Sequence, residues 1–223
     1  MKKTLVEEVM TTPVVTATEA LPFRDLVALL YARDIGAVPV VTLAGRVLGV
    51  VSNGDLIAKA ADPPVIAGPR PEHRLCRRDR RSLARTASEL MTTPAVTIRP
   101  EATIEQAARL MRRHRVGRLP VVVTGQLTGI VSRSDLLRIY RRPGEEIRAE
   151  ILAEVLPRMP GADPRRLAVS VHDGVVSLSG QVKCSSAVAR LITAALAVEG
   201  VVGVDERVGY DVDDSYYPVM AGF

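Results

Sequence analysis

The sequence predicts an α+β fold in which two tandem β-α-β-β-α repeats precede a smaller α-β-β-α-β domain. Two observations support the repeats. The phrase Met-Thr-Thr-Pro occurs at residues 10–13 and again at 91–94, and Gly-x-x-Ser-x-x-Asp occurs at 49–55 and again at 129–135. Such internal repetition fixes the architecture before any local assignment. A third observation, a change of pattern after residue 141, predicts the separate C-terminal domain.

The first repeat is expected to cover residues 5–58. It should contain a short strand, a helix, two hairpin strands and a second helix, which begin near residues 14, 22, 38, 47 and 53. Pro22 suits a first helical turn, and the apolar residues that follow it are spaced as on one face of a helix. The two hairpin strands are β-branched runs joined across Gly45.

The second repeat is expected to cover residues 86–141 in the same order. Thr103 is a predicted N-cap, and Gln106, three residues later, would complete a capping box. Between the repeats, residues 59–85 are rich in proline and arginine, which predicts an exposed linker.

The C-terminal domain is expected to cover residues 143–213. An amphipathic helix should come first, followed by two alternating strands that are joined by an Asp-Gly turn at Gly174. A second helix should be capped by Ser185 or Ser186 and end at Gly200, before a last strand. This order predicts a three-stranded sheet with both helices on one face.

Composition and charge indicate a soluble protein. The chain has 223 residues, of which 47% are apolar and 25% charged, and no apolar run approaches the ~20 residues that span a bilayer. Acidic residues interrupt the N-terminal stretch where a signal peptide needs an apolar core, so we expect a cytoplasmic location. The segment 70–85 carries a net charge of +5, equal to that of the whole chain. Aromatic residues make up only 3% of the chain, which favours a solvated linker over a nucleic-acid-binding segment.

The sequence offers little for catalysis. Cys76 and Cys184 could form a disulfide, although a cytosolic setting favours free thiols. The three histidines are scattered, and no Cys/His cluster has metal-ligand spacing, so no metal site is predicted. No Ser-His-Asp or Cys-His constellation or phosphate-binding loop occurs either. We therefore expect a non-enzymatic protein without an obligatory cofactor.

The two repeats resemble a tandem pair of cystathionine-β-synthase (CBS) domains. The resemblance rests on Met-Thr-Thr-Pro, Gly-x-x-Pro-Val-Val and Gly-x-x-Ser-x-x-Asp, which occur in this order twice. It implies that the repeats pack about a pseudo-two-fold axis and leave two clefts for an adenine nucleotide (AMP, ADP or ATP) or a related adenosyl ligand. It also implies a homodimer.

By the same resemblance, the Ser and Asp of the last phrase face the ribose hydroxyls. These residues are Ser52 and Asp55 in one cleft and Ser132 and Asp135 in the other. A carboxylate at a helix start can accept hydrogen bonds from both hydroxyls of a ribose. The same pattern is also a capping box, which needs no ligand. Recurrence in register favours ribose binding, and the two roles can coexist because a carboxylate has two oxygens.

Further residues are assigned to the clefts. The resemblance implies that the walls include Thr16, Val38, Pro39, Thr97, Leu119 and Pro120. Three arginines of the second repeat, Arg115, Arg118 and Arg133, are candidates for phosphate contact in either cleft. Alternatively, they are surface charges that solubilise an arginine-rich protein. Their counterparts in the first repeat are Asp34, Ala37 and Asn53.

The C-terminal part resembles a BON domain through the pattern L-x-V-x-V-x-x-G-x-V-x-L-x-G-x-V, which begins at Leu167. The resemblance implies association with phospholipid, with the cell envelope or with other partners. The last strand runs into Asp211, Asp213 and Asp214, and an acidic end opposes binding to anionic lipid. A protein-interaction or ligand-sensing role is therefore at least as well supported.

These features together predict a regulatory protein that senses an adenine nucleotide through the CBS pair and relays the signal to an unknown protein partner through the BON domain. The alternative is an interaction or phospholipid-associated protein, not an integral membrane protein, in which the CBS pair is only a dimerisation scaffold. Attachment to nucleic acid through residues 70–85 is a weaker third hypothesis.

Overall fold

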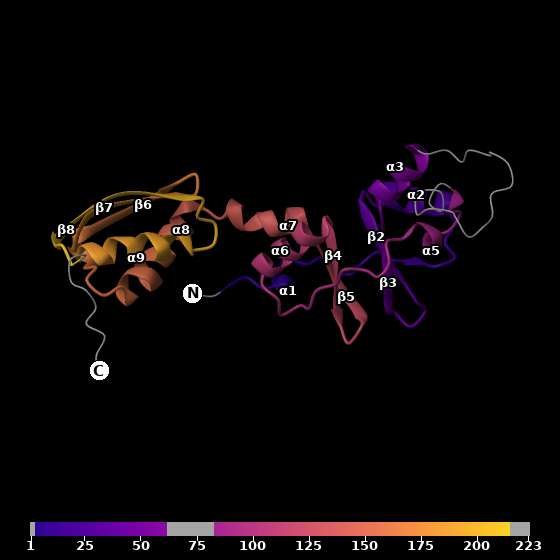
Figure 1. Cartoon of the computed structure of the whole chain (residues 1–223), viewed down its shortest axis with the longest axis horizontal. Helices are drawn as coiled ribbons and strands as arrows, with labels where there is room; N and C mark the ends of the chain where they lie inside the picture. The colour runs from indigo at the N-terminus through magenta and orange to yellow at the C-terminus, as the bar shows by residue number, and fades with distance from the viewer. Residues whose placement is uncertain (1–2, 62–82, 215–223) are drawn as a thin grey trace. The chain divides into compact units, whose positions relative to one another are not determined.

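The structure of the chain is a computed structural model that describes residues 3–61 and 83–214. It consists of two compact units, one of Thr4–Leu136 and one that begins at Leu137 (Figure 1). Cys76 and the arginines between residues 70 and 81 lie outside the described residues. The expectations about the linker and about a disulfide therefore stay predictions.

The first repeat has the predicted helix, hairpin and second helix, preceded by one short helix and a strand of two residues. Its elements are α1 (Val6–Val9), β1 (Ala17–Thr18), α2 (Phe23–Ala32), β2 (Ala37–Val41), β3 (Val47–Ser52) and α3 (Asn53–Ala61). β1 lies parallel to β2, and β2 pairs antiparallel with β3. Pro22 is the N-cap of α2, where its missing N–H leaves no helical hydrogen bond unmade. Leu26 and Leu30 form the buried face of this helix.

The second repeat has the same helix-hairpin-helix core. Its elements are α5 (Ala87–Leu90), α6 (Ile104–His114), β4 (Arg118–Val123), β5 (Gln126–Ser132) and α7 (Arg133–Leu137). The predicted capping box of α6 is confirmed, because the Gln106 N–H donates to Thr103 Oγ1 at 3.3 Å and the Thr103 N–H donates to Gln106 Oε1 at 2.9 Å. The buried face of α6 carries Ile104, Ala107 and Met111.

The first strand of each repeat differs from expectation. Residues 14–16 are not a strand, β1 comprises only the next two residues, and the second repeat keeps a single bridge between Ile98 and Val121 at this place. The preceding backbone pairs with the other repeat instead, since the Thr11 N–H donates to the Ile130 carbonyl at 2.8 Å. The four-residue helices α1 and α5 are too short for apolar periodicity to predict them.

The contacts between the repeats come in reciprocal pairs. The matched backbone bridges are Leu5–Thr103 with Thr86–Pro22 and Thr11–Ile130 with Thr92–Val50, while Arg46–Gln126 joins two equivalent residues. A bridge between equivalent residues lies on a two-fold axis, so the predicted α+β fold with a pseudo-two-fold axis is confirmed. Each repeat therefore pairs its opening segment with the other repeat.

The repeated phrases of the sequence also contact each other across this axis. A Cβ added to Gly49 would lie 2.6 Å from the Met91 sulfur, and a Cβ added to Gly129 would overlap the sulfur of Met10. The glycine of one phrase therefore leaves room for the methionine of the other. This packing explains both residues without any ligand.

The C-terminal unit is a three-stranded sheet with strand order β6-β7-β8 and both helices on one face (Figure 1). Its elements are α8 (Gly144–Glu150), β6 (Leu167–His172), β7 (Val175–Cys184), α9 (Ser185–Leu196) and β8 (Gly203–Val212). The predicted Asp-Gly turn joins β6 to β7, with positive φ at Asp173 (48°) and Gly174 (77°). Alternate strand residues pack with α8 and α9 around Ile147, Leu178 and Leu191.

The predicted N-cap of α9 is wrong. Cys184 occupies the cap position and makes no side-chain cap hydrogen bond. The N–H of Ser186 donates instead to Asp214 Oδ1 at 2.8 Å, and the Ser185 hydroxyl donates to the same oxygen at 2.8 Å. A carboxylate from beyond β8 thus supplies the cap, because an anion is stabilised at a helix N-terminus.

The predicted C-cap of α9 is also wrong. The helix ends at Leu196, and Ala197 rather than Gly200 is its C-cap. Gly200 has a φ of 93°, and an added Cβ would lie 2.9 Å from the Ile139 carbonyl oxygen. This glycine therefore allows the segment before α8 to approach the end of α9 closely.

Candidate functional site

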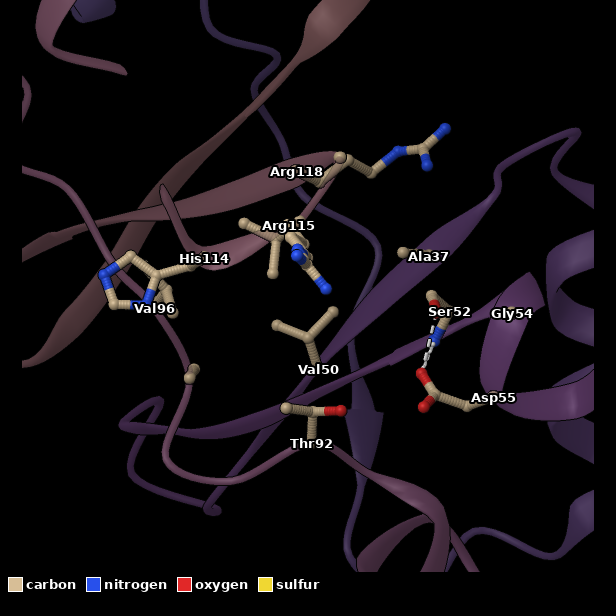
Figure 2. Close-up of a pocket in the computed structure, with 13 residues that line it drawn as sticks. Ala37, Val50, Ser52, Gly54, Asp55, Thr92, Val96, His114, Arg115 and Arg118 are labelled. Atoms are coloured by element: carbon tan, nitrogen blue, oxygen red, sulfur yellow. Dashed lines mark hydrogen bonds between the residues drawn. The ribbon is translucent and has the colours of Figure 1, made fainter. Parts of the chain in front are cut away.

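A cavity of about 340 Å³ lies between the two repeats (Figure 2). The first repeat lines it with Ala37, Val50, Ser52, Gly54 and Asp55, and the second with Thr92, Ala95, Val96, His114, Arg115, Val116, Gly117 and Arg118. The end of β3 and the start of α3 therefore meet the turn that joins α6 to β4. The reciprocal pairing of the repeats brings these distant segments together.

Asp55 and Ser52 form a compact polar pair on one side of the cavity. Asp55 Oδ2 accepts hydrogen bonds from the Ser52 N–H at 2.9 Å and from the Ser52 hydroxyl at 2.7 Å, as Figure 2 shows for this pair. The side chain is 7% exposed, and it is the one buried charged residue in the part of the chain that the structure describes. Its hydrogen bonds offset the cost of burying a carboxylate.

Ser132 and Asp135 repeat this arrangement at the start of α7. Asp135 Oδ2 accepts from the Ser132 N–H at 2.8 Å and from the Ser132 hydroxyl at 2.6 Å, while the Asp135 N–H donates to the same hydroxyl at 3.4 Å. This copy is a reciprocal capping box, as expected from the pattern. Both copies are thus formed by local hydrogen bonds, and the ribose role stays a prediction.

Two of the three predicted phosphate residues line the cavity of Ser52 and Asp55. Arg115 ends α6 in the left-handed conformation (φ 55°), and in Figure 2 its side chain extends into the space near Val50. Arg118 begins β4, and its guanidinium lies against Gly36. In the described ranges, neither arginine takes part in an ion pair. The Arg115 charge therefore faces the cavity, while the Arg118 charge lies beside Gly36.

Arg133, the third predicted phosphate residue, does not line this cavity. Its Nη2 donates to the Val116 carbonyl at 3.3 Å, and its N–H donates to the Gly117 carbonyl at 3.1 Å. Arg133 thus holds the backbone of the turn that carries the other two arginines. The sequence cannot distinguish a residue that contacts a ligand from one that supports such a residue.

The predicted wall residues are also outside the lining of this cavity. Val38 and Leu119 are completely buried, and Pro39 and Pro120 are buried beside them, while Thr16 is exposed and Thr97 half-buried. Strand alternation explains this result for Val38 and Leu119, because neighbouring residues of a strand point to opposite faces of a sheet. The wall is formed instead by Ala37 and Val50.

The sequence reasoning missed Thr92, Val96 and His114. Thr92 belongs to the second Met-Thr-Thr-Pro phrase, and its backbone pairs with Val50 of the other repeat, which places it at the cavity. The recurrence of this phrase was a usable signal for Thr92. His114 and Val96 carry no such signal, since their position depends on the packing of one repeat against the other.

Two regions of the chain, residues 6–62 and 87–142, match the CBS domain and together cover half of the chain. This chain belongs to the CBS-domain family. A BON domain follows at residues 144–210. The tandem CBS pair with a C-terminal BON domain, as predicted from the motifs, is therefore confirmed.

Several known proteins are similar to this chain in sequence. An uncharacterized protein of Methanocaldococcus jannaschii is 28% identical over 175 residues, which are 77% of this chain but only 40% of that protein. A CBS domain-containing protein of Dictyostelium discoideum is 34% identical over 136 residues, which are 60% of this chain and 90% of that protein. This chain thus spans less than half of the archaeal relative and nearly all of the other.

Solved structures match the CBS pair. The structure of CBSX2 in complex with AMP is 27% identical, with a TM-score of 0.52 over 60% of this chain and 94% of that chain. A CBS domain pair that was solved with 5′-methylthioadenosine and S-adenosyl-L-methionine is 20% identical, with a TM-score of 0.51 over 63% of this chain and 98% of that chain. The second similarity shows the fold alone.

Neither a metal-binding cluster nor a membrane-spanning helix occurs in the described residues. No group of three or more His, Cys, Asp or Glu side chains there could hold a metal ion. No helix among those residues is long and apolar enough to cross a membrane.

Proposed function

We propose that this chain is a non-enzymatic regulatory protein that binds an adenine nucleotide, or a related adenosyl compound, between its two CBS repeats. The observation that carries the proposal is the joint lining of one cavity by Ser52 and Asp55 from one repeat and by Arg115 and Arg118 from the other. A carboxylate opposite fixed positive charge suits a ligand that has sugar hydroxyls and a phosphate. The AMP complex of the related CBSX2 supports the same ligand class.

Each part of such a ligand has a matching group in the cavity. The Asp55 carboxylate would accept from the ribose hydroxyls, as a carboxylate at a helix start can. Arg115 and Arg118 would bind the phosphate through charge-assisted hydrogen bonds. Val50 and Val96 offer apolar surface to the base. Ser132 and Asp135 remain the candidates for a second cleft.

A relay to the BON domain is supported by hydrogen bonds that follow the chain out of the cavity. The cavity carbonyls of Val116 and Gly117 accept from Arg133, the first residue of α7. α7 continues directly into the 3-10 turn Arg138–Arg141. The next residue, Arg142, donates to the Glu199 carbonyl at 2.7 Å and pairs with Glu150 at 2.9 Å. In this proposal a shift of the cavity turn passes along the chain to the C-terminal unit, and that unit would contact the unknown protein partner.

Isothermal titration of the purified chain with AMP, ADP and ATP tests the proposal. We expect at least one of them to bind, and Asp55→Asn to weaken binding by roughly 10-fold or more, because a hydrogen bond to a charged acceptor is lost. Asp25→Asn, an exposed carboxylate on α2, is the matched control and should bind as the unaltered chain does. Circular dichroism checks that both variants are folded. Binding of none of the three nucleotides, or equal binding by Asp55→Asn, would show that the proposal is wrong.

A further inference from the structure

We infer that the two clefts of the CBS pair differ in the charge of the ligand they accept, so that one chain binds one phosphorylated nucleotide, in the cleft of Ser52 and Asp55. The inference rests on the proposed function and concerns which cleft is used, and why. It starts from the pseudo-two-fold axis, which relates each residue of the cavity to an equivalent residue of the other repeat.

The main difference is at the turn after the first long helix of each repeat. Arg115 ends α6 with a φ of 55°, and Asp34, its equivalent, follows α2 with a φ of 50°. Both residues hold the left-handed conformation, which is uncommon for residues other than glycine. The backbone therefore presents the two side chains in the same way, while the charge is reversed from positive to negative.

A second difference concerns the start of the following strand. Arg118 begins β4, whereas its equivalent at the start of β2 is Ala37, which lines the cavity without adding charge. The cavity of Ser52 and Asp55 is thus lined by two arginines of the opposite repeat. Arg115 extends into it, whereas the Arg118 guanidinium lies against Gly36 (Figure 2). The two equivalent positions of the first repeat, Asp34 and Ala37, supply one carboxylate and no cation.

Arg118 does not correct this imbalance. Its guanidinium lies against Gly36, and it lines a groove of about 750 Å³ together with Asp34 and Asn53. A phosphate that approached from this side would meet the Asp34 carboxylate as well as the arginine. Like charges placed together oppose binding, and such repulsion gives selectivity between otherwise similar sites.

Two consequences follow for the ligand. The phosphate determines which cleft binds the nucleotide, so AMP should bind at one site per chain. Adenosine lacks the phosphate, so Arg115 should not raise its affinity. A substitution should also be able to transfer phosphate binding to the second cleft. An arginine at position 34 should create a phosphate site in the second cleft, because Arg115 already adopts the same backbone conformation at the equivalent position.

Titration calorimetry with AMP and with adenosine tests the inference on the full chain and on variants at positions 34 and 115. We expect one AMP per unaltered chain, a loss of roughly 10-fold or more in AMP affinity for Arg115→Asp, and adenosine affinity that is unchanged by that substitution. Asp34→Arg should raise the stoichiometry from one AMP to two. In the double variant Arg115→Asp, Asp34→Arg, we expect Asp135→Asn, and not Asp55→Asn, to remove AMP binding.

The possible failures are distinguishable. If the unaltered chain binds no AMP, ADP or ATP, the proposed function is wrong and the inference falls with it. If AMP binds but fills two equal sites, or if Arg115→Asp leaves its affinity unchanged, the proposed function stands and the inference is overturned. A stoichiometry of one for a folded Asp34→Arg variant would likewise overturn it.

Discussion

Asp55 and Asp135 occupy equivalent positions and make the same hydrogen bonds to a serine, yet only Asp55 is buried. A charged group is costly to bury unless hydrogen bonds compensate it, and the bonds from Ser52 do so. They also fix the carboxylate in one orientation, which lowers the entropy that a ligand must lose on binding. The capping role and the proposed ribose role therefore support each other at this residue.

Asp214 is a residue whose contribution depends on pH. The Ser186 hydroxyl, the Ser186 N–H and the Ser185 hydroxyl lower the pKa of Asp214 from 3.8 to about 2. A pKa that is lowered by folding means that the ionised group stabilises the fold above its unfolded pKa, and that this stability is lost as the pH falls through the folded value.

We therefore expect Asp214→Asn to lower the midpoint of thermal unfolding of the chain at pH 7. The difference from the unaltered chain should shrink between pH 3.8 and about pH 2, where Asp214 becomes protonated in both states. Asp205→Asn, on an exposed part of β8, is the matched control and should leave the midpoint unchanged. A constant difference across this pH range would contradict the capping role. Calorimetric scans at several pH values measure it.

Helices and hairpins are the features that the sequence predicts best. Apolar spacing located α2 and α6, and the Thr103–Gln106 pair and the Asp173-Gly174 turn were correct because both are local, with partners at most three residues apart. The caps of α9 were wrong because their partners are distant. Asp214 lies about 30 residues from Ser186, and no local pattern indicates that contact.

The packing of the repeated phrases depends on contacts between a glycine of one repeat and a methionine of the other. A side chain at Gly49 would collide with Met91, and one at Gly129 with Met10, each time across the pseudo-two-fold axis. These contacts hold the opening segment of one repeat against the hairpin of the other. They account for part of the duplicated sequence independently of nucleotide binding.

Replacement of either glycine should therefore destabilise the CBS pair. We expect Gly49→Ala and Gly129→Ala each to reduce the free energy of unfolding by about 1–3 kcal/mol, as overpacking does in close-packed interiors. Gly54→Ala is the control in the same unit, because an added Cβ there meets its nearest atom at an ordinary 3.5 Å. Urea unfolding measures the three variants, and equal stability of Gly49→Ala and Gly54→Ala would contradict the packing.

The candidate site was predictable only in part. Ser52, Asp55, Arg115 and Arg118 were identified from their motifs and from the charge difference between the copies, and they line one cavity. The predicted wall residues do not line this cavity, where Val38 is buried and its neighbour Ala37 forms the lining. Sequence spacing also could not show that the arginines of one repeat meet the carboxylate of the other.

The whole chain joins these parts through α7, whose first residue supports the cavity turn and whose continuation is held by Arg142. The proposed relay predicts that binding at the cavity also changes the C-terminal unit. By hydrogen exchange, we expect AMP to protect residues 92–118 and also residues 139–147. In Arg142→Ala we expect only the first effect to remain, because the bonds to Glu199 and Glu150 are lost.

The matched control for this relay is Arg158→Ala, which removes an exposed ion pair with Glu154 in the same unit. It should leave both protection effects intact, since exposed ion pairs contribute little. Protection that stops at residue 137 in the unaltered chain would contradict the relay. Protection of residues 139–147 that persists in Arg142→Ala would show that another route carries the signal.

Because each CBS repeat pairs its opening segment with the other, neither copy is a complete folding unit by itself. The duplication is therefore obligatory: losing one copy would leave the other without the backbone partners of its hairpin. Residues that take no part in this reciprocal pairing, such as those at positions 34 and 115, can differ between the copies. A protein built in this way needs both copies in order to fold. Only one of its two clefts needs to bind the ligand.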